Sequence, residues 1–260
     1  MVGTSCDHRR KWAFSLALLA STALAVRLAS AEDLKPKFGP DATTIQQSHE
    51  YFRTHEAAHY WALSPFYAPQ ITDSACSVAA IAMLLNSLRG VPPHSVDPLV
   101  TQQGLLDRVA NVRWTTETAQ DGAGVTFDEL VADTRASLEA YGLAADLDIF
   151  KPQDDSAASL AQVRRLLIEN ELSDRDIVLV YFDQGVLTGD WDGPHISPIA
   201  TYDADLRHVL IMDVDRQWHI PYWSSDEKLL AAMLRPAPAS MGVLAGQTGG
   251  LLRVRLKTGR

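Results

Sequence analysis

The sequence predicts an α+β fold in which a helical first half packs against an antiparallel sheet built by the second half. Up to residue 169 the clearest patterns are helical, because helix-start and helix-stop residues bracket runs of good helix formers. After residue 176 the pattern changes to short β-branched and aromatic runs separated by turn residues. Helices followed by strands are typical of α+β proteins, and the junction between two such halves is a common place for a cleft.

The most apolar predicted helix begins near residue 74. Asp73 and Ser74 are good N-cap residues, and the run SVAAIAMLLNSLR that follows them is apolar on nearly every side. Gly90, followed by two prolines, is a typical helix end. A helix that is apolar all round is buried, so we expect this one to be the central helix of the protein.

Two further helices and four strands complete the predicted framework. Thr126 and Glu129 form a capping box that starts a helix reaching about Tyr141, and residues 156–169 form an amphipathic helix. The predicted strands cover residues 177–182, 195–202, 208–214 and 251–257. Residues 202–205 form a short connection of the hairpin type, so the second and third of these strands should pair antiparallel.

The first 31 residues have the features of a secretory signal peptide. A basic triplet at residues 9–11 precedes an apolar run over residues 12–26, and the Ala-Ser-Ala sequence that ends at Ala31 is a typical cleavage site. We predict cleavage after Ala31, with Ala25 as the alternative. The apolar run is shorter than the roughly 20 residues that a membrane span needs, so a retained anchor is the less favoured alternative. The protein is therefore expected to be periplasmic or secreted.

The mature chain is strongly acidic and long enough for one domain. Cleavage after Ala31 removes four basic residues and one acidic residue, which moves the formal charge from −9 to −9 − 3 = −12. An acidic chain is poorly suited to bind nucleic acid or an anionic membrane surface. The remaining 229 residues (260 − 31) predict a leader over residues 32–45 and one domain over residues 46–260. The oligomeric state stays open.

A zinc-protease pattern, H-E-x-x-H, occurs at residues 55–59. In that pattern two histidines on one helix face bind zinc, and the glutamate moves the proton of a bound water. A third ligand is required, but the usual position six residues after His59 is Pro65, and no glutamate occurs in the sixty residues after Glu56. Asp73 is the remaining candidate ligand. We therefore predict no metal site, and expect His55 and His59 to be solvated on an exposed helix.

Cys76 is the only cysteine left after signal cleavage, so it has no partner for an internal disulfide. Composition alone leaves two readings open, a buried structural cysteine and a reactive thiol. The predicted helix places Cys76 in its first turn, where the positive end of the helix dipole favours a thiolate. Gln70, six residues upstream, has the spacing of the glutamine that stabilises the oxyanion in papain-like enzymes.

A thiolate nucleophile needs a histidine, and His195 is the best placed of the seven in the mature chain. It follows a Gly-Pro turn at the start of a predicted strand, while Asp213 ends the next strand. Antiparallel pairing would bring the start of one strand beside the end of the other, so Asp213 could orient the imidazole. An ordinary strand-end aspartate remains the alternative for Asp213. We expect solvated or edge positions for His208 and His219, and a proline-rich turn for His94.

Three segments of the chain together resemble the phytochelatin synthase family. They are QITDSACSVAAIAMLLNSL, GPHISPIATYDADLRHVLIMDVDR and IPYWSSDEKLLAAM, and the resemblance runs from about residue 46 to about residue 235. It implies a papain-like cysteine protease fold, with a central nucleophile helix packed on the antiparallel sheet half. The roles that it implies are nucleophile for Cys76, acid/base for His195, orienting carboxylate for Asp213, oxyanion donor for Gln70 and, as a weaker match, substrate binding for Arg216.

The resemblance also implies an activity. Members of this family cleave the glycine from glutathione through a γ-glutamylcysteinyl thioester on the cysteine, and pass the acyl group to water or to a second glutathione. No cofactor is required for that chemistry, and divalent heavy-metal ions enter as metal–glutathione thiolate substrates. A role in metal detoxification is the corresponding expectation. We expect hydrolysis to dominate over polymerisation in this chain.

Three departures from the family pattern stand out. Ser77 and Ala200 occupy positions where the family usually has glycine, and Arg235 is the only charged residue over residues 235–250, where the family carries groups that hold the γ-glutamyl moiety. Substrate choice therefore stays open. The alternatives are a papain-like peptidase acting on other exported peptides and a non-catalytic protein that binds thiol peptides.

Overall fold

The strands of the protein form one antiparallel sheet. The computed structural model describes residues 36–94 and 96–257, and the predicted signal peptide lies outside them. The sheet order is β1-β6-β5-β4-β3-β7-β2, with every neighbouring pair antiparallel. The strands are β1 (Thr43–Thr44), β2 (Ala145–Phe150), β3 (Asp176–Asp183), β4 (Pro194–Asp203), β5 (His208–Ile211), β6 (Tyr222–Ser225) and β7 (Gly250–Leu256).

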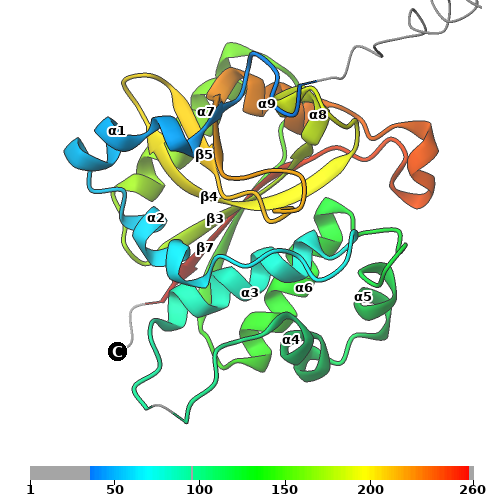
Figure 1. Cartoon of the computed structure of the whole chain (residues 1–260). Helices are drawn as coiled ribbons and strands as arrows, with labels where there is room; N and C mark the ends of the chain where they lie inside the picture. Colours follow the sequence, from blue (N-terminus) through cyan, green and yellow to red (C-terminus); the bar gives the residue numbers. More distant parts are fainter. Residues whose placement is uncertain (1–35, 95, 258–260) are drawn as a thin grey trace, which may run out of the picture. The chain divides into compact units, whose positions relative to one another are not determined.

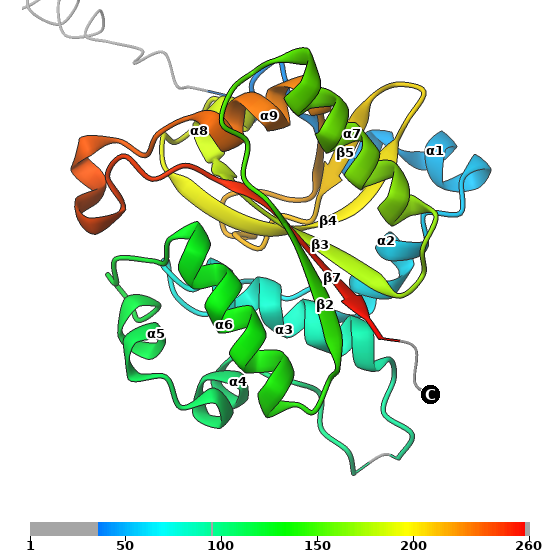
Figure 2. The ribbon, with the colours of Figure 1, turned by 180° about the vertical axis from the view of Figure 1, so that it is seen from behind.

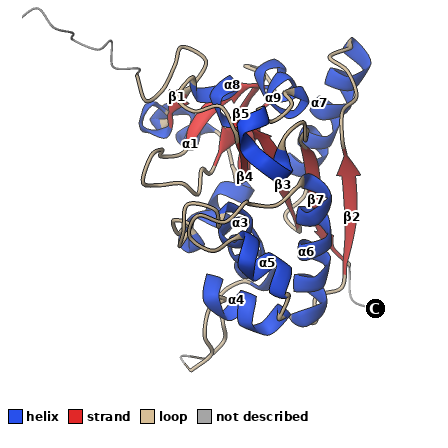
Figure 3. Cartoon of the chain, turned by 90° about the vertical axis from the view of Figure 1, so that its right-hand side faces the viewer, coloured by secondary structure: helices blue, strands red, loops and turns tan. Residues whose placement is uncertain are grey.

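Helices cover both faces of this sheet (Figures 1 and 2). Helices α3 and α6, with α4 and α5 beside them, lie on one side of the strands, and α7, α8 and α9 lie on the other, as the secondary-structure colouring of Figure 3 also shows. The helices are α1 (His49–Thr54), α2 (Ala58–Leu63), α3 (Cys76–Arg89), α4 (Gln102–Val109), α5 (Val112–Glu117), α6 (Phe127–Ala140), α7 (Ala157–Glu171), α8 (Gln184–Thr188) and α9 (Asp226–Leu234). The predicted α+β class is confirmed.

Two hydrophobic cores fill the spaces between the sheet and its helices. Side chains alternate along a strand, so Leu179 of β3 joins the core under α3 and α6, whereas Val178 and Val180 join the core under α7 and α9. Every residue of β3 is buried, because this strand is covered on both faces. The expected antiparallel hairpin is β4–β5.

Helix α3 is the predicted central helix, and all ten residues from Ser77 to Asn86 are buried. Its end at Gly90, with a φ of 71°, agrees with the sequence. Its start does not: the N-cap is Ala75, which makes no side-chain capping bond, so the prediction that Asp73 or Ser74 caps the helix is wrong. Helix α6 begins at the predicted capping box of Thr126.

The third predicted strand is shorter than expected. Strand β5 ends at Ile211 rather than at residue 214, and its pairing with β4 contains a bulge between Ile199 and Thr201. The predicted leader is described from residue 36 onward. There it supplies β1, which pairs with β6 at the edge of the sheet, and Phe38, which packs against the core under α7 and α9.

The H-E-x-x-H segment is not a continuous helix. Helix α1 ends at Thr54, Ala57 takes a left-handed conformation with a φ of 46°, and α2 begins at the next residue. His55 is exposed, as predicted, and stacks on Tyr51. His59 is only 2% exposed, so the expectation that it is solvated was wrong. Over residues 36–94 and 96–257, no three His, Cys, Asp or Glu side chains are placed to hold a metal ion, and no helix is long and apolar enough to cross a membrane.

Candidate active site

Cys76 is the first residue of α3 and is held there by the segment that precedes the helix. The Ser74 hydroxyl donates to the carbonyl of Gly122 at 2.6 Å, and the N–H of Asp121 donates to Asp73 Oδ1 at 3.0 Å. The two residues predicted as helix caps therefore tie the start of α3 to the loop before α6. This leaves the first turn of α3 without a side-chain cap, with Cys76 only partly buried.

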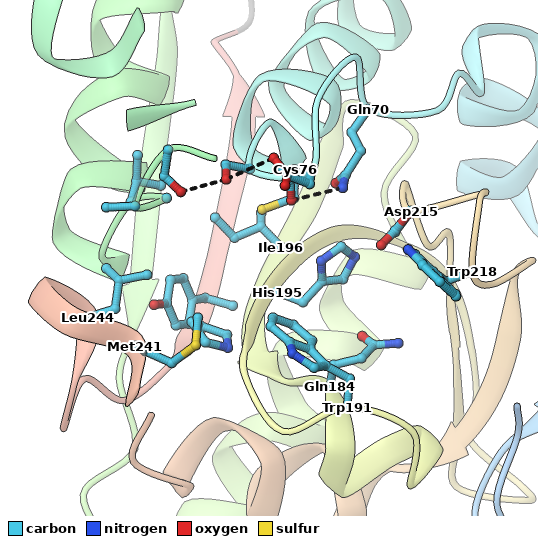
Figure 4. Close-up of a pocket in the computed structure, with 18 of the residues that line it drawn as sticks. Gln70, Cys76, Gln184, Trp191, His195, Ile196, Asp215, Trp218, Met241 and Leu244 are labelled. Carbon is cyan, nitrogen blue, oxygen red and sulfur yellow. Dashed lines mark hydrogen bonds between the residues drawn. The ribbon is translucent and has the colours of Figure 1, made fainter. Parts of the chain in front are cut away.

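A cavity of about 550 Å³ opens beside Cys76 (Figure 4). Its lining comes from both halves of the protein, because Gln70, Cys76 and the 122–125 loop belong to the helical side, whereas His195 and Trp218 belong to the sheet side. The expected cleft at the junction of the two halves is therefore present.

His195 lines this cavity and forms a buried pair with Asp213, which lies outside the lining. His195 is the second residue of β4, and Asp213 follows the end of β5, which the antiparallel pairing brings to the same place. The imidazole donates from Nε2 to Asp213 Oδ1 at 2.9 Å. Its other nitrogen, Nδ1, makes no bond to Asp213 and is left for Cys76, which lines the same cavity. The structure therefore brings Cys76, His195 and Asp213 to one place, as their order in the chain predicted.

The charges of this group reinforce one another. Burial lowers the pKa of His195, but the Asp213 carboxylate and the Cys76 side chain outweigh it, so the pKa lies well above its ordinary value. Burial raises the pKa of Asp213, and the charge of His195 outweighs that effect, so this pKa lies below its ordinary value. The arrangement therefore favours an imidazolium next to the cysteine, which is the state that stabilises a thiolate.

Three neighbours fix Asp213 in place. The Gln184 amide donates to Asp213 Oδ2 at 3.0 Å, and the N–H of Asp215 donates to Asp213 Oδ1 at 2.9 Å. The Tyr67 hydroxyl donates to the Asp213 carbonyl at 2.5 Å. No sequence pattern indicated Gln184 or Tyr67, because each reaches Asp213 only through the folding of distant segments.

His219 is also part of this group, contrary to the expectation of a solvated or edge position. It is 4% exposed, and its Nδ1 lies 3.7 Å from Asp213 Oδ2 and 3.3 Å from the Gln184 amide. Burial lowers the pKa of His219 below its ordinary value, outweighing the charge of Asp213. The polar segment around His219 resembles a surface turn in sequence, but the His219 ring packs edge-on against Phe38, which is distant in the chain.

Gln70 lies at the cavity, as expected for an oxyanion donor. Its backbone N–H donates to the carbonyl of Val214, and its side-chain amide donates to the carbonyl of Asp73 at 3.2 Å. Arg216 lies outside the cavity lining. It is exposed, and its guanidinium lies 4.8 Å from the centre of the ring of Tyr67, the residue that donates to the Asp213 carbonyl.

The first helical turn accommodates the serine that replaces the family's glycine. Ser77 is fully buried, and its hydroxyl accepts a hydrogen bond of 3.0 Å from Trp114 Nε1. Ala200 is also fully buried within β4. Both side chains are therefore accommodated within the packed interior.

The central helix of this α+β protein begins at a cysteine, and that cysteine faces a histidine on an antiparallel sheet. This arrangement is the papain-like fold. The family model of phytochelatin synthase matches residues 42–241, and this chain belongs to the phytochelatin synthase family. It is 24% identical over 183 residues to glutathione gamma-glutamylcysteinyltransferase 2 of Arabidopsis thaliana, covering 67% of this chain and 36% of that protein. It is 24% identical over 174 residues to glutathione gamma-glutamylcysteinyltransferase 3 of Lotus japonicus, covering 63% of this chain and 32% of that protein. The chain thus spans about a third of the length of these curated relatives.

Proposed function

We propose that this protein is a thiol acyltransferase and hydrolase that removes the glycine from glutathione through a thioester on Cys76. The observation that carries the proposal is the buried His195–Asp213 pair, joined at 2.9 Å, beside a cysteine that begins a helix at the wall of a cavity. Family membership and the names of the two relatives support glutathione as the acyl donor. Export to the periplasm or beyond, and metal–glutathione thiolates as substrates, are parts of the same proposal.

In the first half-reaction the Cys76 thiolate attacks the carbonyl carbon between the cysteine and glycine of glutathione. The developing oxyanion accepts hydrogen bonds from the Gln70 amide and from the backbone N–H of Cys76. His195 gives its proton to the glycine nitrogen as the carbon–nitrogen bond breaks, and Asp213 holds the imidazole in position for that transfer. Glycine leaves, and the γ-glutamylcysteinyl group stays on sulfur as a thioester.

In the second half-reaction an acceptor attacks the thioester. With water as the acceptor, His195 takes a proton from it and γ-glutamylcysteine is released. With a second glutathione, its amino group attacks in place of water and loses a proton to His195, and the acceptor glutathione is extended by one γ-glutamylcysteine unit. Both routes return Cys76 to the thiolate.

Intact-protein mass measurement after brief exposure to glutathione tests the proposal. The expected result is a species heavier by one γ-glutamylcysteinyl group, mapped to Cys76, together with free glycine in solution. A protein that binds glutathione with neither an adduct nor glycine release would be a thiol-peptide binding protein, which would refute the proposal. Cleavage of other peptides without action on glutathione would instead support a general peptidase.

Removing the Gln70 amide is expected to slow the reaction without preventing substrate binding. The change Gln70→Ala should lower kcat by about a hundredfold and leave KM nearly unchanged, because an oxyanion donor acts mainly in the transition state. Steady-state rates of glycine release measure this effect. Gln103→Ala, at an exposed glutamine of α4 outside the cavity lining, is the matched control. Equal rates for both variants would exclude Gln70 as the donor.

A further inference from the structure

The charged side chains of the active-site cavity are unfavourable for free glutathione. Three carboxylates contribute to the lining, from Asp73, Asp190 and Asp215, whereas no lysine or arginine among the described residues does so. The two lining histidines offer no free positive charge, because His195 is paired with Asp213 and burial lowers the pKa of His219. Glutathione at neutral pH carries two carboxylates and one ammonium group. Its own ammonium can balance one carboxylate, and the other finds no positively charged partner in the cavity lining.

The two ends of the cavity differ in chemistry (Figure 4). On one side of Cys76 lie Met241 and Leu244, which are apolar, and on the side of His195 lie Asp215 and Trp218. Because His195 must protonate the leaving nitrogen, the leaving group lies on the His195 side of the nucleophile. The part of the substrate beyond the broken bond therefore faces a carboxylate and an indole ring.

This corner already holds an ammonium group from the protein itself. Lys37, in the segment before β1, places Nζ 5.3 Å from the centre of the Trp218 ring. Burial raises the pKa of the Asp215 carboxyl above its ordinary value, and the charge of Lys37 acts in the opposite direction. An aromatic face next to a carboxylate is a combination that binds organic cations. Lys37 is exposed, so a substrate could displace it.

We propose that the leaving-group end of the cavity is an ammonium site, and that the preferred substrate is a glutathione-type peptide whose glycine carboxyl is amide-linked to an amine-bearing group. This inference rests on the proposed function of Cys76. The thiolate attacks the same cysteinyl carbonyl, the same carbon–nitrogen bond breaks, and His195 protonates the nitrogen of a glycyl amide that leaves with its cation beside Asp215. The amide link removes the glycine carboxylate, which is the charge that lacks a partner. The added ammonium group gains two partners, the Asp215 carboxylate and the Trp218 ring.

Three substrates test the inference: glutathione, its propylamide and its 3-aminopropylamide. Both amides mask the glycine carboxylate with a propyl chain, and only the second carries an ammonium group at the end of that chain. For the wild-type protein kcat/KM should be about three- to tenfold higher for the aminopropylamide than for the propylamide, the range expected for one partly exposed ion pair with a cation–π contact. In Asp215→Asn this ratio should fall towards about one. Asp155→Asn, which makes the same change at an exposed site outside the lining, should keep the wild-type ratio.

Lys37→Ala separates the two roles that this lysine could have. If Lys37 competes for the ammonium site, its removal raises kcat/KM for the aminopropylamide. If it instead binds the glycine carboxylate, its removal lowers kcat/KM for glutathione, and the inference is overturned. Equal kcat/KM values of the wild-type protein for the two amides would also overturn it. Turnover of none of the three peptides, with no adduct on Cys76, would refute the proposed function itself and the inference with it.

Discussion

Replacing Cys76 with alanine is expected to lower the rate of glycine release from glutathione by about four to six orders of magnitude. The thiolate is the only group in the proposed reaction that forms a bond to the substrate, so no other side chain can replace it. Cys76→Ser should be almost as inactive, because a hydroxyl beside His195 is far less ionised than a thiol. Initial rates with mature protein, together with the absence of a thioester by intact mass, measure the effect.

The same variants show whether a loss of activity comes from chemistry or from folding. Cys76 is only partly buried, so its replacement by alanine should change the unfolding temperature little, and glutathione should still bind in calorimetry. Wild-type rates in Cys76→Ala would rule out the thioester mechanism. Loss of binding together with loss of the melting transition would mean that the alanine variant is misfolded. The rate of glycine release by Cys76→Ser, which keeps the size of the side chain, would then test the role of the thiol.

Most of the candidate site is predictable because it depends on local topology. His195 and Asp213 lie in one hairpin, so their pairing follows from two strands and a short turn, and Gln70 and Cys76 lie six residues apart at one helix start. His219 could not be assigned in this way. It lies in a polar segment that looks solvated, and what buries it comes from residues far away in the sequence.

The secondary structure was predictable where a sequence pattern extended over a whole helix. It was not predictable where the burial of a side chain depended on residues far away in the sequence. An apolar run located α3, a capping box located α6 and an amphipathic pattern located α7, whereas the short strands β2 and β6 lack a comparable pattern. The H-E-x-x-H segment shows why spacing alone misleads. Its letters fit a helix, but the left-handed Ala57 interrupts the chain between the two histidines. His59 then turns inward to a carboxylate that is 117 residues away.

That carboxylate, Asp176, is the centre of a buried charged group at the start of β3. It accepts hydrogen bonds from the Asn170 amide at 3.0 Å and from Arg253 on β7, and lies 3.2 Å from His59 Nε2. Asp176 is 1% exposed and Arg253 is 4% exposed. Arg253 has a second partner in Glu169, at 3.0 Å, but that side chain is about half exposed. The group joins α2, α7 and two strands, so its contribution to stability should be large.

Asp176→Asn is expected to lower the free energy of unfolding by about 3 kcal/mol at pH 7, because it leaves the buried Arg253 without its main counter-charge. Burial raises the pKa of Asp176, but His59 and Arg253 outweigh it and the pKa lies below its ordinary value. A lowered carboxylate pKa stabilises the folded state above the ordinary value of about 3.9, and this contribution disappears as the pH falls through the lowered pKa. The free energies of unfolding of the wild type and the variant, measured with denaturant, should therefore differ at pH 7 and converge at acid pH.

Asp148→Asn is the matched control, because it breaks a half-exposed pair with Arg255 on the same sheet. It should lower the free energy of unfolding by less than about 1 kcal/mol. An equal loss in both variants would show that burial of the Asp176 group is not what stabilises the fold.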